Sequence, residues 1–321
     1  MYHLENRAAA CCTLHAAGCG AAVLLPAAAS YMLVRVLVLA AGGTLTFQEV
    51  TTAPSAVPSS ARGPLTGTWR TLVTPPRSGA ANMALDHALM ERARRTGERV
   101  LRVYTWSGPT LSLGRNQAAR GRIDDDTARA LGVMLVRRPT GGRALLHHRE
   151  VTYSVTAHLE RGDSVREWYA AINAILLDAL HRLGVDAEPA ISHGRTPLPA
   201  TASCFVRADE GEISFAGRKL VGSALLRRED ALLQHGSILL DDDQALLERI
   251  LPTGEGHPMP AGTLRQALGR DVGVAEVASA LVTALGAAGA EASALDADAQ
   301  LVVDAEEAER IYASEEWTFR S

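Results

Sequence analysis

Hydrophobic residues recur with helical spacing in several parts of the chain. The clearest case is residues 164–183, where Trp168, Ile172 and Leu176 fall on one stripe and Gly184 follows as a residue that ends helices. The predicted helices cover residues 78–96, 124–131, 164–183, 274–285 and 306–313.

Other segments alternate hydrophobic and polar residues, as half-buried strands do. The Ala216-Gly217 pair predicts a hairpin turn within residues 212–224. Further strands are predicted at residues 100–106, 110–114, 133–138, 143–157 and 232–240. Because several strands are adjacent in sequence, the pattern predicts an α+β fold in which helices pack on a mixed sheet, rather than strict alternation of strand and helix.

Residues 1–66 differ from the rest of the chain. They hold an Ala-rich run and an apolar stretch over residues 21–41, followed by a linker rich in Ser, Pro and Thr. The apolar stretch is typical of a signal peptide or anchor, but Pro26 and Arg35 interrupt it and it begins far from Met1. We therefore expect residues 1–66 to be a disordered or spurious extension, and residues 67–321 to form one folded domain with helices at its C-terminal end.

The charge balance argues against two classes of partner. The net charge of -4 gives no electrostatic reason to bind nucleic acid or an anionic membrane. Among the 32 basic residues, however, Lys219 is the only lysine. Arginine replaces lysine easily on a solvated surface but not where a compact ammonium is needed, so Lys219 is a candidate for a required ammonium. Chance survival on the surface is the alternative.

Cysteine usage points to a reducing compartment. Cys11, Cys12 and Cys19 lie in the first 66 residues, which leaves Cys204 alone in the body of the chain. An intradomain disulfide is thus impossible there, and we expect a cytoplasmic protein. Because no Cys/His ligand spacing occurs, we expect no metal site.

The segment R-R-P-T-G-G-R-A-L-L-H, residues 137–147, is the first candidate for binding chemistry. Gly141 and Gly142 allow backbone N–H groups to approach a ligand closely, and Arg138 can hold a phosphate or carboxylate. The alternative is a plain hairpin.

Cys204 and Lys219 form the second candidate. A thiolate is a good acyl acceptor, and a nearby ammonium lowers the thiol pKa and polarises the carbonyl under attack. A lone cysteine is more often an inert buried side chain. Ser223 follows in a run of small residues, which suits a backbone approached by a ligand and equally suits close strand packing.

Three histidines carry an open question. His235, in L-Q-H-G-S, is a possible base, although a hydrogen bond within the sheet is the commoner role, and the same holds for His147 and His148. The chain has no G-x-S-x-G elbow, Walker loop or H-E-x-x-H motif.

Taken in order, these motifs resemble the lipoate–protein ligase and octanoyltransferase family. The match runs from about Trp69 to the C-terminus. It comprises N-M-A-L-D (82–86), S-L-G-R-x-Q (112–117), R-R-P-T-G-G-R-A, E-V-T-Y-S-V (150–155), C-F, G-R-K-L-V-G-S-A and L-Q-H-G-S-I-L-L. The ending Y-A-S-E-E-W-T-F (312–319) resembles the family's octanoyltransferases.

The resemblance implies a biotin/lipoate-ligase-like fold with a central, mostly antiparallel sheet flanked by helices. It implies that the Arg-Gly-Gly segment wraps the ligand and that Lys219 contacts the acyl carbonyl or an adenylate phosphate. The implied ligand contacts are Arg138, Gly141, Gly142, Lys219 and Ser223, to which we add His147 and His235. One departure is that His147-His148 stands where the family usually has His-Asp, which puts a role for an acid there in doubt.

The position of Cys204 favours the transferase branch. Lipoate ligases use ATP and usually need an accessory domain, whereas the octanoyltransferase branch places a nucleophilic Cys in a C-F pair upstream of G-R-K. The roughly eighty residues after Leu240 show helices and loops with no convincing set of strands. The resemblance therefore predicts octanoyl transfer from acyl carrier protein to a lysine of a lipoyl domain or glycine-cleavage H protein, without a cofactor. An ATP-dependent lipoate ligase and a non-catalytic acyl-binding module are the alternatives.

Overall fold

The computed structural model describes residues 63–190, 212–251, 260–296 and 298–320, together with four strands before residue 52. The chain divides into two units, Met1–Ala61 and Arg62–Ser321. In the first unit β1 (Cys12–Ala16) pairs with β2 (Cys19–Val23), and β3 (Leu33–Leu39) pairs with β4 (Leu45–Thr51), both antiparallel. The expectation that residues 1–66 are a disordered or spurious extension stays a prediction.

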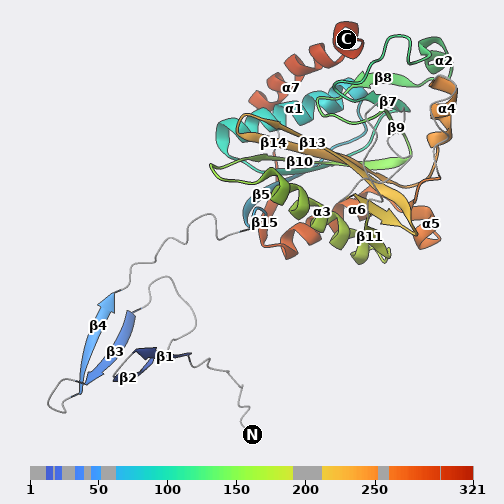
Figure 1. The fold of residues 1–321 in the computed structure, drawn as a ribbon. Helices are drawn as coiled ribbons and strands as arrows, with labels where there is room; N and C mark the ends of the chain where they lie inside the picture. Colours follow the sequence, from blue (N-terminus) through green and yellow to red (C-terminus); the bar gives the residue numbers. More distant parts are fainter. Residues whose placement is uncertain are drawn as a thin grey trace. The chain divides into compact units, whose positions relative to one another are not determined.

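An eight-stranded sheet forms the centre of the second unit (Figure 1). Its spatial order is β11-β12-β13-β14-β10-β6-β5-β15. The strands are β5 (Gly67–Val73), β6 (Val100–Tyr104), β10 (Glu150–His158), β11 (Ala187–Pro189), β12 (Ile213–Phe215), β13 (Arg218–Arg228), β14 (Ala231–Leu239) and β15 (Ala290–Ala294). Only the β5–β6 and β5–β15 pairings are parallel, so the sheet is mixed and mostly antiparallel, as predicted.

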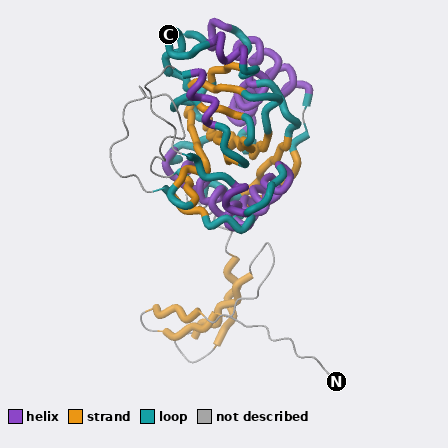
Figure 2. The backbone as a smooth tube through the Cα atoms, turned by 90° about the vertical axis from the view of Figure 1, so that its right-hand side faces the viewer, coloured by secondary structure: helices purple, strands orange, loops and turns teal. Residues whose placement is uncertain are grey.

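Helices cover both faces of this sheet (Figures 1 and 2). On one face α3 (Val165–Arg182) packs beside α6 (Val274–Ala287), and Trp168, Ile172 and Leu281 join the main hydrophobic core there. On the other face α1 (Gly79–Thr96) contacts β10 and β14 and packs against α7 (Ala299–Tyr312). The shorter helices are α2 (Asp125–Ala130), α4 (Leu247–Ile250), α5 (Leu264–Leu268) and α8 (Glu315–Thr318). None of the helices in the described ranges is long and apolar enough to cross a membrane.

Successive side chains of β10 alternate between the two faces of the sheet. Val151, Tyr153 and Val155 point into the core with α3 and α6. On the opposite face Thr152 bonds to Trp106 and Ser154 bonds to Asp86 of α1. The sheet face toward α1 is therefore rich in polar groups, and the candidate site forms there.

A second sheet holds the glycine motif. Strand β7 (Thr110–Leu113) lies at its centre, with β8 (Met134–Arg137) parallel on one side and β9 (Leu145–His147) antiparallel on the other. Since β8 and β9 do not pair with each other, the plain-hairpin interpretation of the glycine motif is wrong. The single strand predicted over residues 143–157 is also wrong: it divides into β9 and β10, which belong to different sheets.

Local signals in the sequence explain several boundaries. Helix α1 begins after Ser78, whose hydroxyl accepts a hydrogen bond from the Ala81 N–H, and ends at Gly97 with φ 75°. The predicted hairpin turn is confirmed, with positive φ at both Ala216 and Gly217. Strand β15 was not predicted: its five residues, A-E-A-S-A, are mostly exposed and carry no hydrophobic alternation.

Candidate active site

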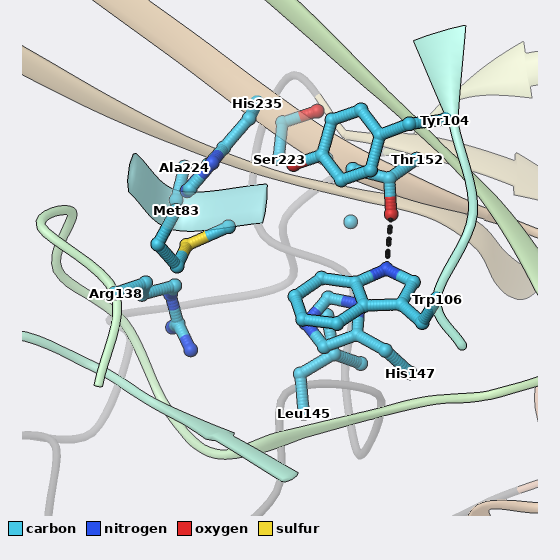
Figure 3. Close-up of a pocket in the computed structure, with 12 residues that line it drawn as sticks. Met83, Tyr104, Trp106, Arg138, Leu145, His147, Thr152, Ser223, Ala224 and His235 are labelled. Carbon is cyan, nitrogen blue, oxygen red and sulfur yellow. Dashed lines mark hydrogen bonds between the residues drawn. The ribbon is translucent and has the colours of Figure 1, made fainter. Parts of the chain in front are cut away.

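A largely apolar pocket lies between α1, β9 and the central sheet (Figure 3). The structure brings together around it four residues singled out from the sequence, Arg138, His147, Ser223 and His235. Gly141, Gly142 and Lys219 are not among its lining residues. The described lining consists of Met83, Tyr104, Trp106, Arg138, Leu145, His147, Thr152, Gly222, Ser223, Ala224, His235 and Gly236.

One wall of the pocket is a stacked pair of rings. The ring centroids of Trp106 and His147 lie 4.0 Å apart, and the ring planes meet at 19°. Figure 3 shows the two rings lying one against the other. The imidazole nitrogens of His147 lie 2.8 Å from the Ser112 hydroxyl and 3.2 Å from the Ser237 hydroxyl. Burial lowers the pKa of His147, and Glu150 only partly opposes that shift. His147 therefore acts in the structure as a neutral wall of the pocket.

Trp106 is held in turn by a short polar chain. Its indole N–H donates to the Thr152 hydroxyl over 2.8 Å, and that hydroxyl donates to Glu150 over 2.5 Å. The second oxygen of Glu150 is buried without a hydrogen-bond partner. Sequence reasoning gave Glu150 no role, although it opens the E-V-T-Y-S-V motif.

Arg138 shapes the glycine loop from within. Its guanidinium donates to the carbonyl groups of Gly141 (2.9 Å), Arg143 (2.7 Å) and Ser112 (3.1 Å). Gly142 has φ 99°, and a Cβ atom there would lie 2.7 Å from the Arg138 guanidinium. The geometry thus assigns Arg138 to the conformation of the loop, a role that the sequence reasoning did not give it.

Arg137, the neighbouring arginine, is completely buried and serves a different purpose. It donates to the carbonyl groups of Gly114 (2.8 Å), Gln117 (2.7 Å) and Thr318 (2.9 Å). The carbonyl groups of Arg115 and Arg320 accept two further hydrogen bonds from it. Arg137 therefore fastens the C-terminal segment to the loop after β7.

His235, on β14, belongs to a buried hydrogen-bond network that includes Asp86 of α1. Its Nδ1 lies 3.2 Å from the Asp86 carboxylate, and its Nε2 lies 2.7 Å from the Thr140 hydroxyl. Burial raises the pKa of Asp86, but Arg102 and His235 outweigh it and hold the pKa below its usual value. Asp86 therefore remains ionised. The sequence singled out His235 but not Asp86 or Thr140, since only the fold brings them together.

Ser223 ends a second polar chain. Its hydroxyl lies 2.7 Å from that of Tyr153, which also accepts from the Gln234 amide at 3.0 Å. Close strand packing explains the neighbouring glycine of L-Q-H-G-S, because a Cβ on Gly236 would lie 2.3 Å from the Gly222 carbonyl oxygen. Ser223 itself is half-buried and lines the pocket, while its hydroxyl bonds to Tyr153, which points into the core with α3 and α6.

Lys219 is buried on β13 with 4% of its surface exposed, which excludes the chance-survival alternative of a surface lysine. Its ammonium lies 2.7 Å from the carboxylate of Glu212, which is also buried. Cys204 lies outside the described residues. In the described part of the chain, no group of three or more His, Cys, Asp or Glu residues is arranged to hold a metal.

Comparison with known proteins agrees with this architecture. Residues 78–286 match the family model of the lipoyl protein ligase A/B catalytic domain. The octanoyltransferase LipM of Carboxydothermus hydrogenoformans is 44% identical over 57% of this chain and 69% of its own length. LipM of Kyrpidia tusciae is 40% identical over 79% of this chain and 99% of its own.

Solved structures share the fold. A lipoate-protein ligase A bound with ATP has a TM-score of 0.68 at 22% identity, covering 78% of this chain and 98% of that one. Protein Ta0514 of T. acidophilum with bound lipoic acid has a TM-score of 0.65 at 23% identity, covering 78% of this chain and 99% of that one. The mixed sheet between helical layers thus defines an α+β domain of the biotin/lipoate-ligase type. The chain belongs to the lipoyl protein ligase A/B catalytic-domain family, in its octanoyltransferase branch.

Proposed function

We propose that residues 67–321 transfer an octanoyl group from acyl carrier protein to a lysine of a lipoyl domain or of glycine-cleavage H protein. The relatives at 40–44% identity are octanoyltransferases, which supports this reaction. The observation that carries the chemistry is the burial of the chain's only lysine, Lys219, against Glu212. An ion pair removed from water is costly to maintain, so its retention favours a functional ammonium.

We place the acyl chain in this pocket on the chemistry of its lining. Met83, Trp106 and Leu145 offer apolar surface, and the neutral His147 stacks on Trp106 without adding charge. At about 0.8 kcal/mol per buried CH₂, an octanoyl tail would contribute roughly 5 kcal/mol of binding. In this proposal Ser223 and His235 line the chain's path, while Gly141 and Gly142 present backbone N–H groups to the thioester end.

The first step is a thioester exchange. The Cys204 thiolate attacks the carrier thioester, a new C–S bond forms, and the carrier sulfur leaves with the proton that Cys204 released. Lys219 stabilises the thiolate before attack and the oxyanion during it. Exchange of one thioester for another is nearly isoenergetic, so ATP is not needed.

The second step forms the amide. The ε-amine of the acceptor lysine attacks the Cys204 thioester and the C–S bond breaks. Of the two protons that the acceptor ammonium gives up, one returns to the Cys204 sulfur and the other passes to solvent. Amide formation drives this step, so the reaction needs no cofactor.

The ATP-dependent ligase is the competing enzyme. The described residues after β14 supply only one strand, β15, and that strand joins the central sheet through β5. The described residues after β14 thus belong to the same compact unit as the central sheet.

A transfer assay separates the three functions. The full chain is incubated with octanoyl-carrier protein and a lipoyl domain in the absence of ATP, and acceptor mass is followed. We expect octanoylated acceptor, and a loss of most activity in Lys219→Arg, because the wider guanidinium cannot take the ammonium's place. Modification only with ATP and free octanoate or lipoate would identify a ligase, and binding without turnover would identify a binding module.

A further inference from the structure

Four donors surround the carboxylate of Asp86. One oxygen accepts from the Arg102 guanidinium and the Ser154 hydroxyl, both over 2.7 Å. The other accepts from the Tyr104 hydroxyl over 2.8 Å and faces the Nδ1 of His235 at 3.2 Å. An ionised carboxylate has about four acceptor positions and no proton to donate. The Nδ1 of His235 must therefore carry the hydrogen.

The other ring nitrogen faces the glycine loop. Nε2 of His235 lies 2.7 Å from the hydroxyl of Thr140, which can donate to it or accept from it. Thr140 is fully buried and lies directly before Gly141, in the loop that connects β8 to β9. Asp86 on α1 thus reaches the glycine loop through one ring and one hydroxyl.

The rest of the loop is held from a different direction. The Thr140 carbonyl accepts from the Arg115 N–H over 2.8 Å, and Arg138 donates to the carbonyls of Gly141 and Arg143. All of these contacts tie the loop to the smaller sheet or to itself. The hydrogen bond between the Thr140 hydroxyl and His235, by contrast, ties the loop to the central sheet, on which Lys219 and Ser223 lie.

We propose that Asp86 is a positioning residue of the active site, which acts through His235 and Thr140 to hold the glycine loop at a fixed place relative to the central sheet. The inference rests on the proposed acyl transfer for the loop's role toward substrate. The hydrogen-bonded connection from Asp86 to the loop does not rest on that function, because it can be measured in the protein without substrate.

The chain offers matched variants for the test. Thr140→Val keeps the shape of the side chain and removes the hydroxyl, whereas Thr140→Ser keeps the hydroxyl. Asp86→Asn removes the ionised acceptor of His235. Ser154→Ala is the control, because it removes a hydrogen bond of 2.7 Å to the other oxygen of the same carboxylate and leaves the contact with His235 in place.

Two readouts are taken on the full chain: amide hydrogen exchange of residues 138–144 without substrate, and KM and kcat for octanoyl-carrier protein. We expect Thr140→Val to speed exchange in the loop about tenfold and to raise KM about tenfold with a smaller change in kcat. Thr140→Ser should keep loop exchange and KM close to the values of the unmodified protein. Ser154→Ala should lower thermal stability without changing exchange in the loop. Since Asp86 and Thr140 act in series, the double variant should exchange no faster than Asp86→Asn alone.

Unchanged loop exchange in Thr140→Val would overturn the proposal. Equal acceleration in Thr140→Val and Ser154→Ala would also overturn it, since that result shows general destabilisation. If Asp86→Asn does not fold, the comparison of Thr140→Val with Thr140→Ser and Ser154→Ala decides alone. Absence of octanoyl transfer in the unmodified protein would contradict the proposed function, while the exchange data would still decide the connection.

Discussion

Gly114 lies so close to Gly142 that a Cβ atom on Gly114 would be 1.9 Å from the Gly142 carbonyl oxygen. The end of β7 and the glycine loop are therefore in backbone contact. We expect Gly114→Ala to displace the loop, lowering the free energy of unfolding by about 2–3 kcal/mol and abolishing most transfer activity. Urea denaturation and the transfer assay measure the two effects.

The matched control is Gly141→Ala. A Cβ atom at Gly141 meets nothing within 4 Å, so this variant should unfold at nearly the same urea concentration as the unmodified protein. Equal stability of Gly114→Ala and Gly141→Ala would contradict the contact.

Arg137→Lys should loosen the C-terminal segment. A lysine cannot reproduce the planar fork that meets the carbonyls of Gly114, Gln117 and Thr318. We expect a loss of about 2–3 kcal/mol in unfolding free energy and faster proteolytic cleavage near Trp317. Arg129→Lys, at a side chain 69% exposed, is the control and should change neither value. Unchanged cleavage in Arg137→Lys would contradict this role.

His147 should make the protein less stable in mild acid. Burial lowers its pKa from the usual 6.5, so below pH 6.5 the unfolded chain binds a proton that the folded chain resists. Stability is thus retained above pH 6.5 and falls as the pH drops toward the lowered value. Between pH 7.5 and 5.5 the free energy of unfolding should therefore fall. In urea denaturation His147→Gln should show a smaller pH dependence, and an equal one would refute the assignment.

The length of the donor's acyl chain should affect the rate. If the chain lies in the pocket of Figure 3, shortening octanoyl to hexanoyl removes two buried CH₂ groups and should lower kcat/KM about 15-fold. Ala224→Leu narrows the pocket, so it should reduce or reverse the preference for octanoyl over hexanoyl. Competition between octanoyl- and hexanoyl-carrier protein measures this preference. Equal rates would place the acyl chain elsewhere.

Short sequence signals made several boundaries of helices and strands predictable. Ser78 and Gly97 mark the ends of α1, and Ala216-Gly217 marks the hairpin, because each of these signals acts on its own neighbours. The division of residues 143–157 between two sheets was missed, since both halves are hydrophobic enough to be strands and only pairing with β7 or β14 separates them.

The site was predictable only in part. Motifs pointed to Arg138, His147, Ser223 and His235, which the structure gathers around one pocket. Their partners were not predictable, because Asp86 lies 149 residues from His235 in the chain and no local pattern links them. Glu212 was missed for another reason: an acidic residue before a hairpin is ordinarily solvated, and here it is buried against Lys219.

The central claim is that Cys204 carries the octanoyl group. Intact-mass analysis after incubation with octanoyl-carrier protein, without ATP or acceptor, tests it most directly. We predict an adduct of one octanoyl group that hydroxylamine removes, that is absent in Cys204→Ala and that forms much more slowly in Lys219→Arg. An unchanged adduct in Cys204→Ala, or acyl transfer that proceeds fully in that variant, would contradict the account.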